Sequence, residues 1–489
     1  MKATAARRSV MRGQGMQVLK NSDLQPAATS PDATSSYSRF GLRKELNVFD
    51  AGAVVVGTII GSGIFLLPSL VAAQVDSFGA VLLIWVLGGL LTLFGAMSLA
   101  ELGSIYPGTG GVCTYLQHAY GPLPAFLYAW ALLVMIHSGS IAALGVAFGL
   151  YSEQVLHLNR VEEKACAVIV ILALTSVSCL GIRGGKLVQN VIAVAKIGGL
   201  AALILVLAIK GSRPIHFFEA GAPTTSHPFS FAGFGVALIA VLWAYEGWHV
   251  VSFIAGEMKA PKVDLPRSLF FGTAIVSVIF VAANFSYYHT LSAIEIRNSN
   301  AVAALAIRTA VGPFASNSLS LLILVSVLGS MNGLILTGPR VYYAMARAGA
   351  FPRALGQLSD RYRTPIIALA LQGIWAAILA ASGSYQQLLT DVIFTAWIFY
   401  GLAVAAVLVL RRRQPGLECP FSVPGYPWPP LLFCAGAAGV VLSALMERPG
   451  GAWLGIGLLA CGVPVYLAGK RRSVGGQEAA TIKMVSSSE

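Results

Sequence analysis

Two hydrophobic segments of this chain are each interrupted by a short run of small and polar residues. The first extends from residue 49 to about residue 74 and carries GTIIGSGIF at positions 57–65. The second extends from residue 231 to about residue 255 and carries WAYEGWH at positions 243–249. Such a break frees backbone N–H and C=O groups, which a bilayer tolerates only where the break lines a cavity in the protein. Two breaks in corresponding positions of a repeat therefore predict the binding site of a membrane carrier.

Ionisable side chains in apolar segments are candidates for function, because a charge within a membrane is costly. Lys196 lies mid-segment, within NVIAVAKIG at positions 190–198; the structural alternative is a lysine that extends its ammonium to the membrane surface. Glu246 can pair with a cationic side chain, or bind and release a proton as its surroundings change. His249 lies about one turn further on and can hydrogen-bond to it. Alternatively, His249 or a tyrosine satisfies Glu246, which then has no ligand role.

The composition is that of an integral membrane protein. Hydrophobic residues make up 56% of the 489 positions and charged residues only 11%, with a mean hydropathy of +0.74. A soluble domain carries about 25% charged residues. Apolar stretches of about 20 residues, long enough to cross a bilayer, recur along the chain. We predict an all-α integral membrane protein with twelve transmembrane helices, at about residues 47–74, 80–102, 122–150, 163–181, 187–209, 231–255, 269–290, 317–345, 365–382, 387–410, 428–446 and 452–469.

The basic residues follow the predicted topology rather than forming a nucleic-acid-binding surface, although the formal net charge is +13. If the N-terminus is cytoplasmic, 25 of the 33 Lys and Arg residues fall on the cytoplasmic side, seven fall outside, and only Lys196 falls within a span. The cytoplasmic clusters include Arg183, Lys186, Lys259, Lys262, Arg267, Arg340, Arg347, Arg353, Arg361, Arg363, Arg411 to Arg413 and Lys470 to Arg472. Basic clusters on alternate loops follow the positive-inside rule. We therefore predict a multi-pass protein of a plasma or inner membrane, with both termini cytoplasmic and no nucleic-acid partner.

The rest of the chain offers no second domain and no catalytic motif. Residues 1–43 are polar, which predicts a disordered cytoplasmic tail. Residues 44–470 form the predicted twelve-helix domain, and residues 471–489 form a second short cytoplasmic tail. The six cysteines have neither metal-ligand spacing nor a disulfide framework, and the sequence contains no phosphate-binding loop, Ser-His-Asp arrangement or zinc motif. We expect no cofactor, no metal site and no enzymatic activity.

The first ten predicted spans divide into two halves of five, at about residues 47–210 and 231–411. Because five is an odd number, the second half crosses the membrane in the opposite sense. The pair is then an inverted repeat, with spans eleven and twelve as an addition. The halves share no obvious sequence identity, so the positions of the two breaks carry this inference.

Several motifs, in their order and spacing, resemble the amino acid–polyamine–organocation superfamily, in particular its L-type amino acid transporter branch. They are GTIIGSGIF at 57–65, AEL at 100–102 with PGTGG at 107–111, WAYEGW at 243–248 with GEMKAP at 256–261 and LPR at 265–267, GSMNG at 329–333 with Arg340, and RRRQP at 411–415 with PF at 420–421. The resemblance covers about residues 44–470. It implies a LeuT-like fold, in which helices one and six are broken, and transport by alternating access.

The resemblance implies an α-amino acid substrate that is held largely by backbone groups. The implied substrate-binding residues are Ile59, Gly61, Ser62, Gly63, Ile64, Trp243, Glu246 and Gly247. The first break offers free N–H groups and the positive end of a helix dipole to the carboxylate, and glycine lets the backbone approach the ligand. Carbonyls at the other ends of the broken helices can accept from the ammonium. The structural alternative is that Gly61 and Gly63 only allow close helix packing.

The resemblance also implies roles for single side chains. Trp243 matches an aromatic gate over the substrate, with an ordinary buried aromatic residue as the alternative. In sodium-coupled relatives a sodium ion ties span one to span eight, and Lys196 matches the lysine that takes its place in the sodium-independent branch. Lys196 is expected to reach the backbone near Gly57 and the hydroxyl of Ser330. Glu101, at the end of span two, is expected to help close the inner gate or to pack the adjoining loop.

The predicted function is sodium-independent secondary transport of α-amino acids in a lipid bilayer, with exchange of one amino acid for another favoured by the resemblance. Proton-coupled symport remains an alternative because of Glu246, His249 and Lys196. Exchange of cationic amino acids or polyamines remains another, because Glu246 can attract an amine. In animal L-type transporters a cysteine between spans three and four joins a heavy subunit. Residues 151–164 contain no cysteine, so no obligate disulfide-linked subunit is expected.

Overall fold

The computed structural model describes residues 44–75, 77–180, 182–214, 231–299, 301–447, 450, 453 and 455–468. The tails predicted at residues 1–43 and 471–489 lie outside this part of the chain. The described backbone is helical apart from its turns, with an isolated bridge between Leu46 and Met258. The helices are α2 (Val48–Ile59), α3 (Gly63–Gln74), α4 (Phe78–Ile105), α5 (Val112–Tyr120), α6 (Pro122–Ala131), η1 (Leu132–Ile136), α7 (His137–Leu156), α8 (Arg160–Cys179), α9 (Ile182–Lys210), α10 (Phe231–Ala244), η2 (Val250–Glu257), α11 (Pro261–Thr290), α12 (Ala293–Arg297), α13 (Val302–Ala310), α14 (Pro313–Arg347), η3 (Arg353–Gly356), α15 (Ile366–Ser382), α16 (Tyr385–Arg413), α17 (Trp428–Glu447) and a last helix at Gly455–Ala468.

Among the described residues, seven helices are long and apolar enough to cross a membrane, and the bent pair α2 and α3 makes an eighth if it counts as one span. Shorter apolar helices cover Gly233–Ala244, Ile366–Ser382 and Gly455–Ala468. The all-helical membrane class predicted from the sequence is therefore confirmed. The number of spans and the inverted repeat stay predictions.

The first break separates α2 from α3. A capping box starts α2, because the side chain of Asn47 accepts from the Asp50 N–H at 2.9 Å while the Asp50 carboxylate accepts from the Asn47 N–H at 3.0 Å. The axes of α2 and α3 then bend by 42° at the break. Because α3 begins at Gly63, the N–H groups of its first turn have no carbonyl of α3 to donate to.

The second break separates α10 from η2, a short 3-10 helix, and it contacts the first. Gly247 has a φ of 107°, a conformation that favours glycine, and a Cβ there would lie 2.5 Å from Cγ2 of Thr58. A Cβ on Gly63 would lie 2.6 Å from Cα of Ala244. Glycine therefore allows each broken segment to pack directly against the other.

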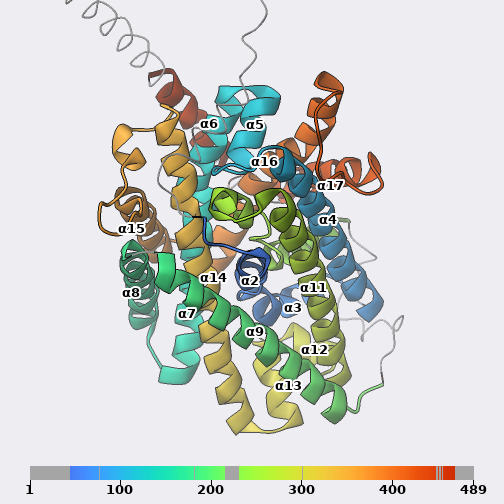
Figure 1. Cartoon of the computed structure of the whole chain (residues 1–489). Helices are drawn as coiled ribbons and strands as arrows, with labels where there is room; N and C mark the ends of the chain where they lie inside the picture. The colour runs from blue at the N-terminus through green and yellow to red at the C-terminus, as the bar shows by residue number, and fades with distance from the viewer. Residues whose placement is uncertain are drawn as a thin grey trace, which may run out of the picture. The chain divides into compact units, whose positions relative to one another are not determined.

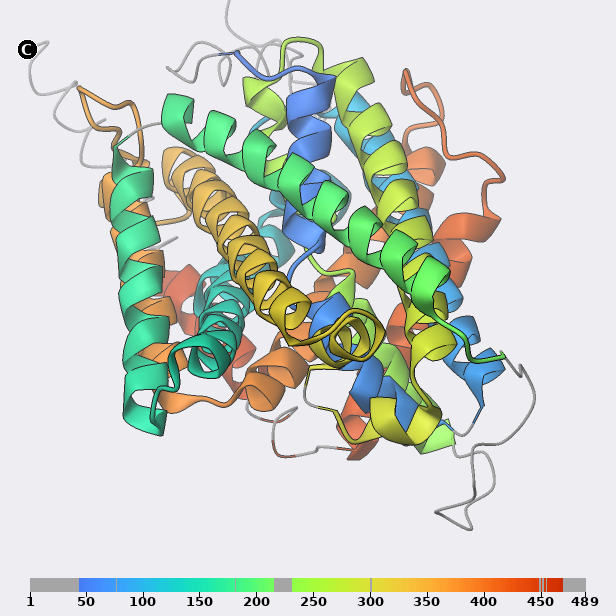
Figure 2. The same ribbon diagram turned by 90° about the horizontal axis from the view of Figure 1, so that it is seen from below.

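The broken helices lie among longer unbroken ones. Helix α2 contacts α9, α11 and α14, and Figure 1 shows it in the middle of these helices. In Figure 2, α9 (green) and α14 (yellow to orange) run beside α2 (blue), in agreement with the contacts among the three. Helix α3 packs against α10. The break in α2 and α3 thus faces α9 and α14 on one side and α10 on another.

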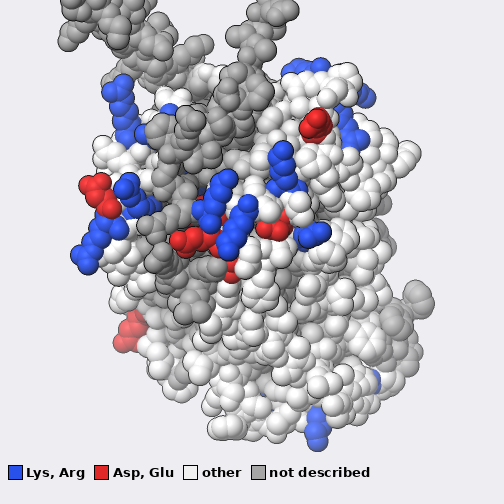
Figure 3. Space-filling model, viewed as in Figure 1, with Lys and Arg blue, Asp and Glu red and all other residues white. Residues whose placement is uncertain are grey.

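The outer surface is apolar over a large region. On the face shown in Figure 3, Lys and Arg gather in the upper half together with a few acidic residues, and most of the lower half carries no charge. Large apolar side chains are exposed along the long helices, for example Val278 of α11 at 70% and Leu321 of α14 at 60%. Exposed apolar side chains on helices of this length are expected where the helices face lipid.

Arg340, which the sequence predicts in a cytoplasmic basic cluster, is buried within α14, at 2% exposure. Its Nε donates to Oε1 of Glu257 at 3.1 Å and its Nη1 donates to the Leu336 carbonyl. The Glu257 carboxylate supplies the counter-charge that a buried cation needs.

Replacing one partner of this pair is expected to destabilise the fold. Glu257→Gln leaves the buried guanidinium of Arg340 without a counter-charge, which costs roughly 3–5 kcal/mol, so the midpoint of thermal unfolding in detergent should fall. Arg213→Gln is the matched control, because Arg213 and Glu295 form an ion pair at 3.2 Å with exposures of 49% and 44%. An exposed pair contributes about 0–1 kcal/mol. Equal midpoints for the two variants would contradict a stabilising role for the buried pair.

Candidate functional site

The two breaks enclose a small cavity near the middle of both broken segments. Its volume is about 30 Å³, and one water needs roughly 10–15 Å³ measured in this way. It is lined by Thr58, Ile59, Gly61, Ser62, Gly63, Ser140, Leu144, Trp243, Ala244, Glu246 and Leu334. In this conformation the space therefore suits one or two waters, and a larger ligand requires the lining helices to move apart.

Most of the predicted substrate-binding residues meet at this cavity. Six of them line it, namely Ile59, Gly61, Ser62, Gly63, Trp243 and Glu246. The N–H groups of Gly63 and Ile64 belong to the first turn of α3, where helix geometry leaves them free. The Ile59 carbonyl accepts from the Gly61 N–H at 2.8 Å, and the Trp243 carbonyl accepts from the Glu246 N–H at 3.0 Å. Each carbonyl keeps a second lone pair for another donor.

Tyr385, which the sequence reasoning missed, contacts two residues that line the cavity. Its hydroxyl lies 3.0 Å from Oγ of Ser62 and accepts from Nε1 of Trp243 at 3.0 Å. The same residue lines a second cavity of about 740 Å³, whose lining includes Glu153 and Arg160. Tyr385 therefore lines the large cavity and also contacts two residues, Ser62 and Trp243, that line the small one. It begins α16, far from both breaks in sequence, and no local pattern marks it.

Lys196 lies behind the first break rather than in the cavity. It is 1% exposed, and its ammonium donates to the carbonyls of Gly57 at 2.6 Å and Ile60 at 2.8 Å and to Oγ of Ser330 at 2.9 Å. The expected reach to Gly57 and Ser330 is thus present. Oγ of Ser326 also donates to the Ile60 carbonyl at 3.0 Å. The carbonyls at the end of a helix carry its negative partial charge, so three hydrogen bonds satisfy the ammonium where α2 is broken.

Glycines allow Lys196 to reach this place. A Cβ on Gly57 would lie 2.5 Å from Nε2 of Gln189, so the glycine lets α9 approach α2 closely. A Cβ on Gly329 of α14 would collide with the side chain of Ile192 and would lie 3.0 Å from Cε of Lys196. The ammonium therefore sits at the meeting point of α2, α9 and α14 because α2 and α14 each have a glycine there, which leaves room for the lysine side chain.

Glu246 is held by Tyr400 of α16, another residue that the sequence reasoning did not name. The Tyr400 hydroxyl donates to Oε1 of Glu246 at 2.6 Å and lies 3.2 Å from Nε2 of His249. The distance between Nδ1 of His249 and Oε1 of Glu246 is 3.7 Å, which is too long for a good hydrogen bond. His249 is therefore joined to Glu246 mainly through Tyr400, and it does not line the cavity.

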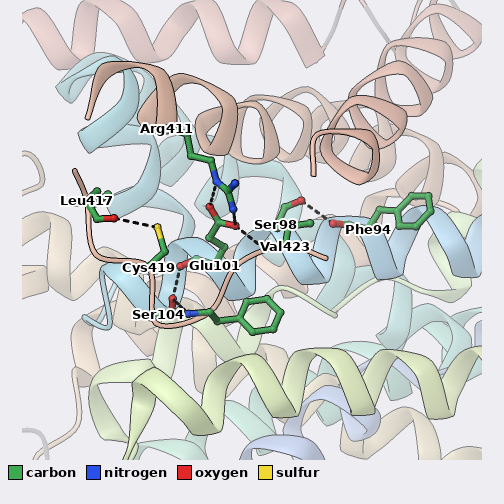
Figure 4. Close-up of polar contacts among 9 residues, drawn as sticks. Phe94, Ser98, Glu101, Ser104, Arg411, Leu417, Cys419 and Val423 are labelled. Carbon is green, nitrogen blue, oxygen red and sulfur yellow. Dashed lines mark hydrogen bonds and ion pairs between the residues drawn. The ribbon is translucent and has the colours of Figure 1, made fainter. Parts of the chain in front are cut away.

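Glu101 ties α4 to the segment that follows α16, as Figure 4 shows. Arg411 donates to both oxygens of the Glu101 carboxylate, from Nε at 2.7 Å and from Nη2 at 2.6 Å. The Val423 N–H donates to Oε2 of Glu101 at 2.7 Å, and the Arg411 guanidinium lies 4.0 Å from the ring centre of Tyr426. This two-pronged ion pair fixes the relative position of the ends of α4 and α16.

Comparison with known proteins places this geometry in a family. The profile of the family described as Amino acid permease matches residues 46–458. The serine/threonine exchanger SteT of Bacillus subtilis (strain 168) is 35% identical over 438 residues, which cover 88% of this chain and 98% of that protein. The human b(0,+)-type amino acid transporter 1 is 32% identical over 417 residues, covering 83% and 84%. The human cystine/glutamate transporter is 31% identical over 431 residues, covering 87% and 85%.

These relatives are transporters rather than enzymes. The family profile covers both breaks, Lys196 and the long helices that surround them, which is the region that the sequence motifs cover. The broken helices, the backbone-lined cavity and this match together show that the chain belongs to the amino acid permease family, within the amino acid–polyamine–organocation superfamily.

Proposed function

We propose that the protein is a sodium-independent exchanger of α-amino acids that works by alternating access. The observation that carries this proposal is the cage around Lys196, whose ammonium donates to the Gly57 and Ile60 carbonyls and to Ser330. In carriers of this architecture, unwound carbonyls at a broken helix coordinate the coupling cation. Here the ammonium of Lys196, which is part of the chain, contacts these carbonyls. The broken helix is therefore held together without sodium. The exchangers among the relatives support the same function.

The proposed architecture has twelve spans, ten of them in two inverted repeats at about residues 47–210 and 231–411, within a domain of residues 44–470. Its support is that the break in the first half and the break in the second pack against each other through Gly63 and Gly247. We also propose that the protein lies in a cell membrane with both termini cytoplasmic. The lack of a disulfide-linked heavy subunit stays a prediction, which rests on the absence of cysteine from residues 151–164.

The proposed binding mode uses the two ends of the break. The substrate carboxylate accepts from the N–H groups around Ser62, Gly63 and Ile64, where the helix dipole of α3 is positive. The substrate ammonium donates to carbonyls near Ile59, Trp243 and Glu246. A site built from backbone recognises the shared core of α-amino acids. The side chain then extends toward the remaining lining residues, including Leu144 and Leu334.

Trp243 and Tyr385 are proposed to form the gate over this site. The indole N–H of Trp243 donates to the Tyr385 hydroxyl, which also contacts Ser62. These contacts join α10, α16 and α3 across the top of the cavity. Opening the path from the larger cavity to the smaller one requires both hydrogen bonds to break.

Two alternatives depend on Glu246. A carboxylate that lines the substrate cavity can bind a proton that moves with the substrate, which would make the protein a proton-coupled symporter. It can also pair with a cationic side chain or a polyamine. A polyamine carries several amines and would be expected to meet several acids, whereas Glu246 is the only acid among the described lining residues. Exchange of amino acids is therefore favoured over exchange of polyamines.

The exchange reaction is tested in proteoliposomes without sodium. We expect labelled alanine to enter vesicles that contain unlabelled amino acids and not empty ones, because an exchanger returns only when loaded. Entry into empty vesicles driven by an inward proton gradient would favour symport instead. Competition by arginine and by putrescine separates amino acids from polyamines. A strict requirement for sodium would contradict the role proposed for Lys196.

Lys196→Met is expected to lower the exchange rate at least tenfold. Methionine has a similar length but no donor and no charge, so the Gly57 and Ile60 carbonyls lose the ammonium and keep only the hydroxyls of Ser330 and Ser326. A hydrogen bond to a charged group contributes about 1.5–3 kcal/mol. Lys210→Met is the matched control, because Lys210 is exposed at the end of the same helix α9. The rates are compared at equal amounts of folded protein, measured by gel filtration. A wild-type rate for Lys196→Met would remove Lys196 from the mechanism.

Tyr385→Phe is expected to weaken the gate while its ring keeps its packing. The change removes contacts to Ser62 and Trp243 that contribute about 1 kcal/mol each, so the concentration of external alanine needed for half-maximal exchange should rise about 5- to 30-fold. Tyr288→Phe is the control, because Tyr288 packs through its ring on Phe78. Trp243→Ala, which removes the gate itself, should abolish exchange in folded protein. Unchanged exchange in both gate variants would contradict this assignment.

A further inference from the structure

Glu246, Tyr400 and His249 form a closed triangle of polar groups beside the substrate cavity. The Tyr400 oxygen lies 2.6 Å from Oε1 of Glu246 and 3.2 Å from Nε2 of His249, and Nδ1 of His249 lies 3.7 Å from Oε1 of Glu246. The side chains of Glu246 and His249 are 8% and 0% exposed, and Tyr400 is 1% exposed. Bulk water therefore has little access to the three groups, and Glu246 alone of them lines the small cavity that has room for one or two waters.

The number of polar protons on the three side chains decides which of their contacts can be hydrogen bonds. An ionised Glu246, a neutral His249 and Tyr400 together carry two polar protons for three contacts. If Tyr400 donates to Glu246, the proton of His249 must be on Nε2 and donate to the Tyr400 oxygen. The unprotonated Nδ1 and Oε1 are then two acceptors 3.7 Å apart, which is beyond good hydrogen-bond distance, and neither supplies a donor to the other. One added proton, on the carboxyl group or on the imidazole, supplies the missing donor.

The surroundings of Glu246 also favour an added proton. Oε2 of Glu246 and Nδ1 of His249 are buried without a hydrogen-bond partner. Within the described residues no Lys or Arg forms an ion pair with Glu246, in contrast to Glu101 and Glu257. A carboxylate that is buried without a counter-charge is unstable and is relieved by a proton.

The side chains packed around the triangle carry no fixed charge. His137 of α7 has its ring centre 6.0 Å from that of His249, and neither of its ring nitrogens has a hydrogen-bond partner. Tyr128 of α6 interacts electrostatically with Glu246, and its hydroxyl is buried without a partner. Phe253 packs against His249 with ring centres 5.3 Å apart. None of these groups brings a permanent positive charge to Glu246.

We propose that the triangle binds one exchangeable proton, which the cationic side chain of a substrate displaces, so that the carrier exchanges a cationic amino acid for a neutral amino acid plus a proton. With a neutral substrate, Glu246 is a carboxylic acid within the triangle. When a substrate ammonium arrives, the O–H bond of Glu246 breaks, its proton leaves to water on the side of entry, and the carboxylate pairs with the ammonium. The two loaded states carry the same net charge. This inference rests on the proposed exchanger function.

The balance of atoms and charge defines the experiment. Proteoliposomes are loaded with alanine and a luminal pH dye, and lysine or alanine is added outside at equal pH. Each turnover with external lysine brings one lysine cation in and takes one alanine and one proton out. We therefore expect the lumen to become alkaline by one proton for each lysine that enters. External alanine should exchange without a pH change, and lysine entry should not respond to a membrane potential set by potassium and valinomycin.

The possible results separate this inference from the exchanger function. Lysine entry that leaves the luminal pH constant and responds to the membrane potential would overturn the proton-for-cation exchange and leave amino acid exchange intact. Failure of lysine to enter while alanine exchanges would overturn it as well, because Glu246 would then not accept a cation. Failure of alanine itself to exchange would refute the proposed function and this inference together.

The pH dependence gives a second test on the unaltered protein. Inhibition of alanine exchange by lysine should strengthen by up to about tenfold per pH unit between about pH 6 and about pH 8, because a proton and the lysine ammonium compete for Glu246. The lysine side chain itself stays charged over this range, since its ordinary pKa is about 10.4. Inhibition by unlabelled alanine should stay constant. Lysine inhibition that does not depend on pH would contradict the competition.

His249 is assigned as a positioning residue for the proton, and a variant distinguishes this role from packing. His249→Gln keeps hydrogen-bonding groups beside Glu246 and Tyr400 but cannot share the proton as an imidazole does. It should therefore shift the midpoint of the pH profile for lysine inhibition. Tyr362→Phe, on a loop away from the triangle, is the control. A variant that reduces only the amount of folded protein, with an unchanged midpoint, would show that His249 has a packing role alone.

Discussion

A helix that is broken inside a membrane must find partners for the backbone groups that it frees, and the rest of this structure depends on how that requirement is met. The freed groups are of two kinds. Carbonyls at the end of α2 meet the Lys196 ammonium and Ser330. The N–H groups at the start of α3 lie at a cavity that the other broken segment also lines. One face of the break is therefore satisfied permanently, and the other is left for a ligand.

The carbonyls and the N–H groups of the break are contacted by different helices. The ammonium of Lys196 joins α2 to α9 and α14 by hydrogen bonds that involve no exchangeable ion, so these helices form one side of the site as a unit. On the other side the broken segments pack directly against each other, and polar side chains add contacts. Tyr385 joins Ser62 to Trp243 through a single hydroxyl, and Glu101 joins α4 to the end of α16 through Arg411. The hydrogen bonds of Tyr385 can break and re-form at modest cost, which alternating access requires, whereas the pair between the buried Glu101 and Arg411 is costly to break.

The buried acids differ in a way that separates structure from function. Glu101 and Glu257 are each paired with an arginine within 3.1 Å, so their charges are balanced whatever the state of the cavity. Glu246 instead contacts Tyr400 and lies near His249, neither of which carries a fixed charge. It also lines the cavity. Its charge can therefore be balanced only by a proton or by a cation that arrives with the substrate, which makes it the acid whose state is coupled to the ligand.

The sequence by itself determined the membrane class, the two breaks and Lys196, because each depends on local composition: long apolar runs, small residues within them and one basic residue far from any polar flank. It also marked Glu246 as an unusual acid. Only the tertiary structure decided that Arg340 is buried and paired, that Tyr385 contacts the cavity lining and that Tyr400 stands between Glu246 and His249. These residues act through partners 83 or more positions away in the chain, and no local pattern contains that information.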